Sequence, residues 1–240
     1  MSEPVTTAEL LIASIAGLLE GLRHVAVGAA SPIPAAGALL ARARSGGRLR
    51  VSLLGSPGHN QFTDGGKELF DCAAQGRIDA FFLSGAQIDG LGNVNLLGTG
   101  GAYPEFQRRF NGCFGSSYLA FLIPRLILFK EQHDRRTLVE RVDFISAPGQ
   151  SPPGIHRPGG PKHLLTGRCL LSFDGQGFHL TSLHPSQTVE TIREHTGFSF
   201  GSAAQVPITP LPDDTTLALI RGPVLAELAD AYPLFAARSL

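Results

Sequence analysis

One stretch of the 240-residue chain gathers amide and carboxylate side chains among glycines, directly after an apolar run at 78–83. Its polar and glycine positions are Gly85, Gln87, Asp89, Asn93 and Asn95. Amide side chains supply neutral donors and acceptors, and aspartate supplies an acceptor or a turn cap. The stretch therefore suits a large polar ligand. The equal alternative is that Asp89-Gly and Gly-Asn93 only build tight turns.

A second glycine-containing string runs from Arg109 to Ser117. Successive backbone N–H groups in such a turn can bind an anion or stabilise an oxyanion. Gly112, Gly115 and Ser116 are the candidate donors. The alternative is a loop that leads into a helix, with Ser116 or Ser117 as its cap. Cys113 has no obvious base beside it, so a thiol nucleophile is not favoured.

A third string, Gly55-Ser56-Pro57-Gly58-His59, brings a hydroxyl and an imidazole together after a predicted strand. A serine hydrolase places its nucleophile in G-x-S-x-G, which this string does not match. His59 is therefore interpreted as a loop residue.

Several other kinds of site are not indicated. Neither G-x-G-x-x-G nor the Walker phosphate loop is present, so dinucleotide or phosphoryl chemistry lacks its usual signature. The eight histidines show no H-x-x-x-H spacing, and no metal site is expected. The three cysteines (Cys72, Cys113 and Cys169) are widely spaced, which argues against a disulfide framework or a cysteine zinc site.

Composition points to a globular protein without nucleic-acid or membrane partners. Twenty basic residues balance twenty acidic ones, so there is no basic surface for nucleic acid or for a polybasic membrane anchor. Apolar residues make up 43 % of the chain, which is enough for a sizeable core. Charged residues make up only 17 %, which suggests that part of the surface is buried against another subunit. Neither a secretory signal nor an apolar run long enough to span a bilayer is recognised, so a cytoplasmic location is expected.

The elements that must position these strings alternate between helices and strands. Helical spacing covers 6–22, with Thr6 and Glu9 as a possible capping box, and further helices are predicted at 34–43 and 64–74. Strands are predicted at 24–28, 49–54 and 78–83. This order predicts the α/β class, with an open, mainly parallel sheet and flanking helices.

The remainder of the chain has a different character. Residues 85–115 are predicted as glycine-rich loop, and 149–161 as an extended surface loop. Strands are predicted at 125–129, 138–145, 169–173 and 178–183, and helices at 189–195 and 213–236. The last two strands should pair through the turn 174–177. We predict a single domain over 1–240, with 201–240 as a C-terminal helical extension.

These strings, taken in order, resemble the β (B) subunit of family I coenzyme A transferases of the glutaconate and 3-oxoadipate type. The resemblance covers Glu9 to about Arg221. Besides the Arg109-to-Ser117 turn, its marks are Gly76-Arg-Ile-Asp79, Gly85-Ala-Gln-Ile-Asp89, Gly92-Asn-Val-Asn95, Val139-Glu-Arg-Val-Asp-Phe-Ile145, Leu180-Thr-Ser-Leu-His-Pro185, Thr196-Gly-Phe198 and Val206-Pro-Ile-Thr-Pro210.

The resemblance implies a NagB/RpiA/CoA-transferase-like fold that pairs with an α-type subunit of similar fold. It also implies an acyl-CoA thioester as substrate and no permanently bound cofactor. In such enzymes a glutamate of the β subunit attacks the thioester to form an acyl–glutamyl anhydride. CoA then displaces the acyl group to give a glutamyl-CoA thioester, and a second carboxylic acid takes the CoA. Under this resemblance the 85–95 loop shapes the ligand crevice, and the 112–116 donors face a thioester oxygen or a CoA phosphate.

The chain departs from the family where the attacking glutamate normally lies, in a Ser-Glu-x-Gly string after the strand that corresponds to 49–54. Here the residues are Leu54-Gly55-Ser56-Pro57-Gly58, and no glutamate occurs between Glu20 and Glu68. Gly55, Ser56 and His59 thus mark a vacated nucleophile position. Ser56 as a replacement nucleophile needs a base, for which His59 is the nearby candidate.

The preferred hypothesis is a β subunit of a heteromeric CoA-transferase-like enzyme, with the catalytic glutamate supplied by the α subunit. One alternative is a subunit of a hydrolase that opens steroid-derived rings on CoA thioesters. An alternative of another class is a non-catalytic module that binds acyl-CoA or sugar phosphates, and a sugar-phosphate isomerase is a further one.

Overall fold

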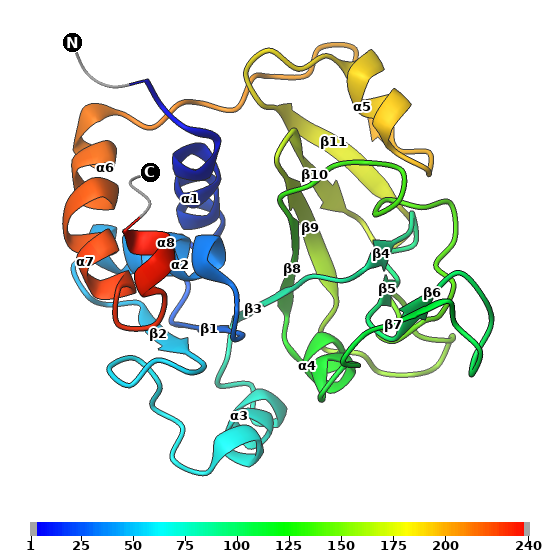
Figure 1. Cartoon of the computed structure of the whole chain (residues 1–240), viewed down its shortest axis with the longest axis horizontal. Coiled ribbons are helices and arrows are strands. Elements are labelled where there is room, and N and C mark those ends of the chain that lie inside the picture. Colours follow the sequence, from blue (N-terminus) through cyan, green and yellow to red (C-terminus); the bar gives the residue numbers. More distant parts are fainter. Residues whose placement is uncertain (1–3, 238–240) are drawn as a thin grey trace. The chain divides into compact units, whose positions relative to one another are not determined.

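The computed structural model describes residues 4–237 of the chain (Figure 1). Contacts divide the chain into two compact units, one formed by residues up to 82 together with residues from 210 onward, and the other by residues 83–209. The first unit therefore joins the two ends of the chain. Whether both units behave as a single domain stays a prediction.

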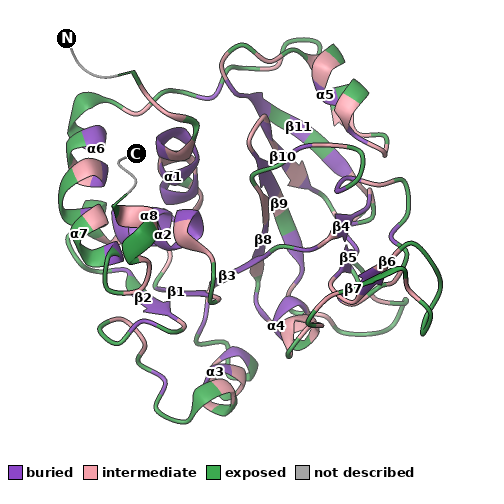
Figure 2. Ribbon diagram, in the orientation of Figure 1, coloured by how far each residue is buried: buried purple, intermediate pink, exposed green. Residues whose placement is uncertain are grey.

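The first unit opens with alternating helices and strands, as the sequence predicts. They are α1 (Thr7–Leu18), β1 (His24–Val27), α2 (Pro32–Arg44), β2 (Arg50–Leu53), α3 (Gly65–Ala74) and β3 (Ala80–Leu83). β1 lies between β2 and β3 and pairs in parallel with both. Every residue of β1 and β3 is buried, which explains their nearly continuous apolar sequences (Figure 2).

Local sequence signals place the first helices. The predicted capping box is confirmed, since the Thr6 hydroxyl accepts from the Glu9 amide while the Glu9 carboxylate accepts from the Thr6 amide. α1 packs against α2 at Gly37, where a Cβ atom would overlap the Ile15 side chain. The glycine therefore permits this close helix contact.

The C-terminal helix predicted over 213–236 is wrong as one continuous element. It begins as expected, with the Asp213 carboxylate accepting from the Thr216 amide at 2.8 Å. The structure then gives α6 (Asp214–Leu219), a π-helical turn (Ile220–Val224), α7 (Leu225–Leu228) and α8 (Pro233–Ala236). Pro223 has no N–H to donate, and the chain widens into the π-helical turn around it. Pro233 begins α8 after a second interruption.

The main sheet of the second unit has the strand order β12-β11-β10-β9-β8. Its strands are β8 (Arg125–Lys130), β9 (Pro161–Thr166), β10 (Cys169–Phe173), β11 (Phe178–Leu183) and β12 (Gly201–Ser202). The predicted hairpin is confirmed, because β10 and β11 are antiparallel and the amides of Gln176 and Gly177 both donate to Asp174. β9 was not predicted, and β12 shows that residue 201 lies in a strand.

The segment predicted as loop over 85–115 is not loop throughout, because it contains two short antiparallel pairs. They are β4 (Gln87–Ile88) with β5 (Val94–Asn95), and β6 (Gly98–Thr99) with β7 (Arg108–Arg109). The helices of this unit are α4 (Ser116–Leu122) and α5 (Val189–His195). The strand predicted at 138–145 is wrong, since only Leu138 makes an isolated bridge, to Ile88. The Val139 amide donates to the Ile88 carbonyl, but farther along the Asp143 amide donates to the Gln87 side chain at 2.9 Å.

The predicted fold class is confirmed. Parallel pairings join β1 with both β2 and β3, β8 with β9, and β11 with β12. In the first unit, α1, α2, α6 and α7 form the helical layer (Figure 1). No helix within residues 4–237 is long and apolar enough to cross a membrane.

Candidate functional site

The loop after β2 carries the position that the sequence marks as vacated. Gly55 has a φ of +87°, a conformation that glycine adopts without strain. The following turn buries Ser56, which is only 2 % exposed. The loop thus presents a hydroxyl at the carboxyl end of a parallel strand, where open α/β sheets bind ligands.

A carboxylate from a distant part of the chain meets this loop. The Ser56 hydroxyl donates to Asp230 Oδ2 at 2.7 Å, and the Gly58 amide donates to the same oxygen at 2.9 Å. These hydrogen bonds, from Ser56 first and Gly58 second, lower the pKa of Asp230. A Cβ atom at Gly58 would lie 3.2 Å from this oxygen, so the glycine admits the close approach. A carboxylate therefore does lie at the position that the sequence marks as vacated. Sequence reasoning missed Asp230 because it lies 174 residues from Ser56 along the chain.

The structure does not pair Ser56 with the His59 imidazole. Ser56 Oγ instead accepts from the His59 backbone amide at 2.9 Å. The imidazole lies beside Glu227, with 3.4 Å between Nε2 and Oε2, and beside Arg42 at 3.4 Å. Arg42 also contacts Glu227 at 3.2 Å. A serine nucleophile activated by His59 therefore lacks the required geometry.

The polar side chains of the 85–95 loop are largely engaged with one another. Asn95, which is fully buried, donates to Gln87 Oε1 at 2.8 Å and to the Gly98 carbonyl at 2.7 Å. Asn93 donates to Asp89 at 3.0 Å and accepts from the Gly149 amide at 3.0 Å. These bonds hold the loop together, which is the turn-building role left open by the sequence. A direct ligand contact by these residues stays a prediction.

One cavity of the second unit reaches this loop through Gln87. It measures about 590 Å³ and is lined by, among others, Gln87, Thr99, Arg108, Lys130, Arg136 and Asp143. Lys130 donates to the Gly85 carbonyl at 3.1 Å, and burial lowers the pKa of Lys130. A Cβ atom at Gly85 would overlap Val94 and lie 2.9 Å from the Asn95 carbonyl, so only glycine fits there. The lining holds three cationic side chains against two carboxylates, those of Asp134 and Asp143, so an excess of one positive charge favours an anionic ligand.

The 109–117 turn has the conformation expected of a glycine-dependent loop. Gly112 and Gly115 have φ values of +88° and +73°. The Ser116 amide donates to the Cys113 carbonyl at 2.7 Å, and Ser116 is the first residue of α4. The loop therefore leads into a helix as the alternative states, but the predicted serine cap is wrong, because Gly115 occupies the N-cap position and no side chain caps the helix. Donation from this turn to a ligand stays a prediction.

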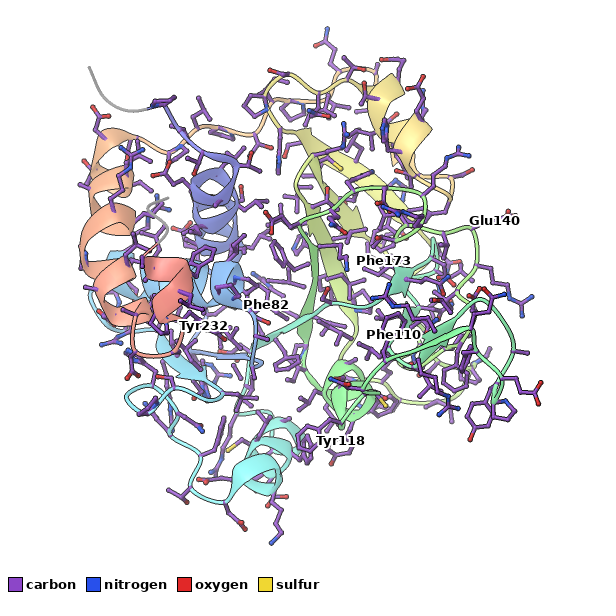
Figure 3. The ribbon with its side chains drawn as sticks, in the orientation of Figure 1. Phe82, Phe110, Tyr118, Glu140, Phe173 and Tyr232 are labelled. Atoms are coloured by element: carbon purple, nitrogen blue, oxygen red, sulfur yellow. The ribbon has the colours of Figure 1, made fainter. Side chains whose placement is uncertain are left out.

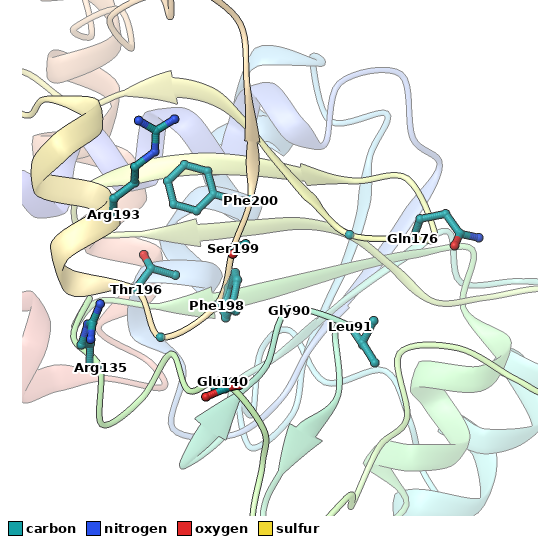
Figure 4. Close-up of a pocket in the computed structure, with 12 residues that line it drawn as sticks. Gly90, Leu91, Arg135, Glu140, Gln176, Arg193, Thr196, Phe198, Ser199 and Phe200 are labelled. Carbon is teal, nitrogen blue, oxygen red and sulfur yellow. The ribbon is translucent and has the colours of Figure 1, made fainter.

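A second cavity of about 640 Å³ was not predicted (Figure 4). Its lining includes Arg135 and Arg193, with Phe198 and Phe200 beside them. Arg135 donates to a backbone carbonyl, that of Glu194, and Arg193 donates to the Ser202 hydroxyl. Neither guanidinium is paired with a carboxylate of residues 4–237. No spacing in the sequence could have predicted this cavity, because its lining comes from four separate segments, 90–91, 135–140, 176–177 and 193–200.

Residues 4–237 contain no group of three or more His, Cys, Asp or Glu side chains placed to hold a metal ion. The buried His133 bonds to the hydroxyls of Thr166 and Thr196 at 2.8 and 2.9 Å. Burial lowers the pKa of His133 to about 4, so this imidazole is neutral at pH 7.

Three characterised proteins resemble the chain in sequence. It is 36 % identical to the B subunit of the 3-oxoadipate CoA-transferase of Pseudomonas knackmussii over 155 residues, which are 61 % of this chain and 58 % of the relative. It is 32 % identical to the B subunit of the glutaconate CoA-transferase of Acidaminococcus fermentans over 149 residues, 58 % of this chain and 54 % of the relative. It is 27 % identical to the cholesterol ring-cleaving hydrolase IpdB subunit of Rhodococcus jostii over 161 residues, 65 % and 62 % of the two chains. The matches span little more than half of each relative's length. No family model matches the chain.

Solved structures agree over a larger share of the chain. A variant of the decarboxylase AibA/AibB superposes with a TM-score of 0.78 at 26 % identity, covering 91 % of this chain and 95 % of the other. Rhodococcus jostii IpdAB superposes with a TM-score of 0.82 at 23 % identity, covering 99 % of both chains.

Proposed function

We propose that this chain, which is similar over part of its length to the B subunits of two CoA-transferases, is the β subunit of a heteromeric enzyme that acts on acyl-CoA thioesters. The proposed reaction moves CoA from an acyl-CoA to a carboxylic acid. The observation that carries this proposal is the similarity to the B subunits of two CoA-transferases with different acids in their names.

The cavity beside Gln87 supports an acyl-CoA as the ligand. CoA carries phosphate groups, and the cavity lining supplies Arg108, Lys130 and Arg136. Arg136 is partly engaged, at 3.2 Å from Asp134, whereas Lys130 contacts only a backbone carbonyl among the hydrogen bonds of the described chain. CoA is a substrate in this proposal, and no permanently bound cofactor is invoked.

The proposed partner is an α-type subunit. The relatives are themselves named as B subunits, and the solved neighbours are two-component proteins. The attacking carboxylate must come from outside the 54–58 string, because that string contains no acidic residue. Its supply by a glutamate of the partner is the expectation from the sequence.

The test is reconstitution. The chain is co-purified with its α-type subunit and incubated with succinyl-CoA and either 3-oxoadipate or glutaconate, and acyl-CoA products are separated by liquid chromatography and mass spectrometry. New 3-oxoadipyl-CoA or glutaconyl-CoA supports the proposal. Transfer at an undiminished rate by the isolated chain contradicts the need for a partner, and absence of transfer with every acid contradicts the reaction class.

C–C bond hydrolysis is the second candidate, favoured by the similarity to a ring-cleaving hydrolase subunit and by the missing glutamate at 54–58. The same incubations without an acceptor acid separate the two reactions. Hydrolysis or decarboxylation consumes an acyl-CoA in water alone, whereas transfer needs the acid. A non-catalytic module binds acyl-CoA or a sugar phosphate in calorimetry and turns over neither.

A further inference from the structure

The segment that follows α7 reaches the carboxyl ends of two neighbouring parallel strands. Asp230 contacts the loop after β2 through Ser56 and Gly58. Two residues later, the Tyr232 hydroxyl accepts from the Ser31 amide at 3.2 Å and lies 3.5 Å from the Gly28 carbonyl, both after β1 (Figure 3). This segment is thereby fixed at the edge of the sheet where ligands of open α/β folds bind.

Only one oxygen of Asp230 is used in these contacts. Oδ2 accepts both hydrogen bonds, and Oδ1 has no hydrogen-bond partner among the described residues. The side chain is exposed, whereas the Ser56 that orients it is buried. The carboxylate is therefore ionised, oriented by two donors, and free on one side to meet another molecule.

The neighbouring acidic side chain, Glu227, differs from Asp230 because it is paired with basic groups. Glu227, one helical turn earlier, is shared between Arg42 and His59. Among the described residues Asp230 makes no ion pair with a lysine or an arginine, and the basic group that acts on it electrostatically is the His59 imidazole. Of the carboxylates near this loop, Asp230 alone combines a fixed orientation with a free oxygen.

We infer that Asp230 is the catalytic carboxylate of this chain and attacks the thioester of an acyl-CoA substrate. This inference rests on the proposed function and replaces the expectation of a partner glutamate. Asp230 Oδ1 bonds to the thioester carbonyl carbon, the C–S bond breaks, and CoA leaves as the thiolate, giving an acyl–aspartyl anhydride. The thiolate attacks the Asp230 carbonyl carbon and releases the acyl group as a carboxylate. The acceptor acid reverses these two steps, which restores Asp230 and needs no oxidant or reductant.

The experiment uses the complex of the chain with its α-type subunit. Asp230→Asn keeps an oxygen that accepts from Ser56 and Gly58 but removes the nucleophile. We expect it to lower kcat for CoA transfer from succinyl-CoA by on the order of 10³-fold or more, with the circular dichroism spectrum unchanged. Asp71→Asn, on the exposed side of α3, is the matched control and should retain the wild-type rate.

Chemical trapping gives a readout that does not depend on a variant's folding. The wild-type complex is incubated with succinyl-CoA and treated with borohydride, which reduces an aspartyl-CoA thioester to homoserine. Peptide mass spectrometry should locate the reduced residue at position 230. Reduction of a partner carboxylate, or transfer by Asp230→Asn at the wild-type rate, overturns the inference while the proposed function stands. A wild-type complex that transfers no CoA overturns both.

Discussion

Removing the Arg221 guanidinium should destabilise the first unit strongly, because it neutralises a carboxylate that water does not reach. Glu9 has 0 % side-chain exposure, and its Oε1 lies 2.5 Å from Arg221 Nε. A second contact joins Glu9 Oε2 to Arg221 Nη2 at 3.2 Å. Breaking a buried pair from one side costs about 3–5 kcal/mol. Glu9 keeps the Thr6 amide at 2.8 Å as a donor, so we expect about 3 kcal/mol for Arg221→Met.

The assay is urea denaturation at pH 7, with Glu9→Gln/Arg221→Met as the matched variant. The double variant removes the buried charge together with its partner and should recover much of the lost free energy of unfolding. A loss below about 1 kcal/mol in Arg221→Met would refute the reasoning, since the pair would then behave as a solvent-exposed one.

The pH dependence supplies an independent check. Burial raises the pKa of Glu9, but hydrogen bonds from Arg221 and Thr6 and the Arg221 charge hold the pKa below 4.5. The stability from this carboxylate is therefore present above pH 4.5 and lost as the pH falls through the lower pKa of the folded state. In Arg221→Met the burial that raises the pKa of Glu9 remains while the Arg221 contributions that lower it are gone, so the loss of stability on acidification should shrink or reverse.

Three further outcomes are expected. Burial lowers the pKa of His133 to about 4, so the unfolded chain binds a proton between pH 6.5 and 4 that the folded chain does not. The free energy of unfolding should therefore fall by about 3 kcal/mol as the pH drops through that range. In urea titrations, His133→Gln should reduce this dependence of the free energy of unfolding on pH. Asn95→Ala should lower the stability by about 1–3 kcal/mol, because it leaves the buried hydrogen-bond partners of Asn95 unpaired. Gln87→Ala should weaken acyl-CoA binding in calorimetry, because Gln87 lines the cavity. An unchanged affinity of Gln87→Ala would mean that the loop has only a structural role. Gly55→Ala should lower the stability by about 1–2 kcal/mol, because alanine is strained at a φ of +87°. Gly17→Ala, on the exposed face of α1, should raise the stability by up to about 1 kcal/mol, because alanine favours the helix. Equal effects of the two substitutions in thermal melts would contradict this conformational argument.

The sequence predicted features that depend on neighbours within a few residues. The capping box of Thr6 and Glu9 and the turn at 174–177 were found because their hydrogen bonds join residues two or three positions apart. The buried strand β3 was found because a strand covered on both faces is apolar along its length.

Predictions failed where a local pattern competed with distant partners. Residues 138–145 alternate like a strand, but after the Val139 amide, which donates to the Ile88 carbonyl, the amides of Val142 and Asp143 donate to the side chains of Asp89 and Gln87. The helix predicted over 213–236 widens into a π-helical turn at Pro223, which has no N–H to donate, and it ends before Pro233, which begins a new helix.

The sequence by itself determined the alternating helices and strands of the first 83 residues, the resemblance to CoA-transferase B subunits and the absence of an acidic residue from the 54–58 string. Only the tertiary structure decided that Asp230 stands against that string, that Asn95 turns inward to Gln87, and that Arg135 and Arg193 share a cavity. The physical reason is that such contacts depend on how separate segments pack. Residues 174 positions apart carry no common period or spacing from which their meeting could be inferred.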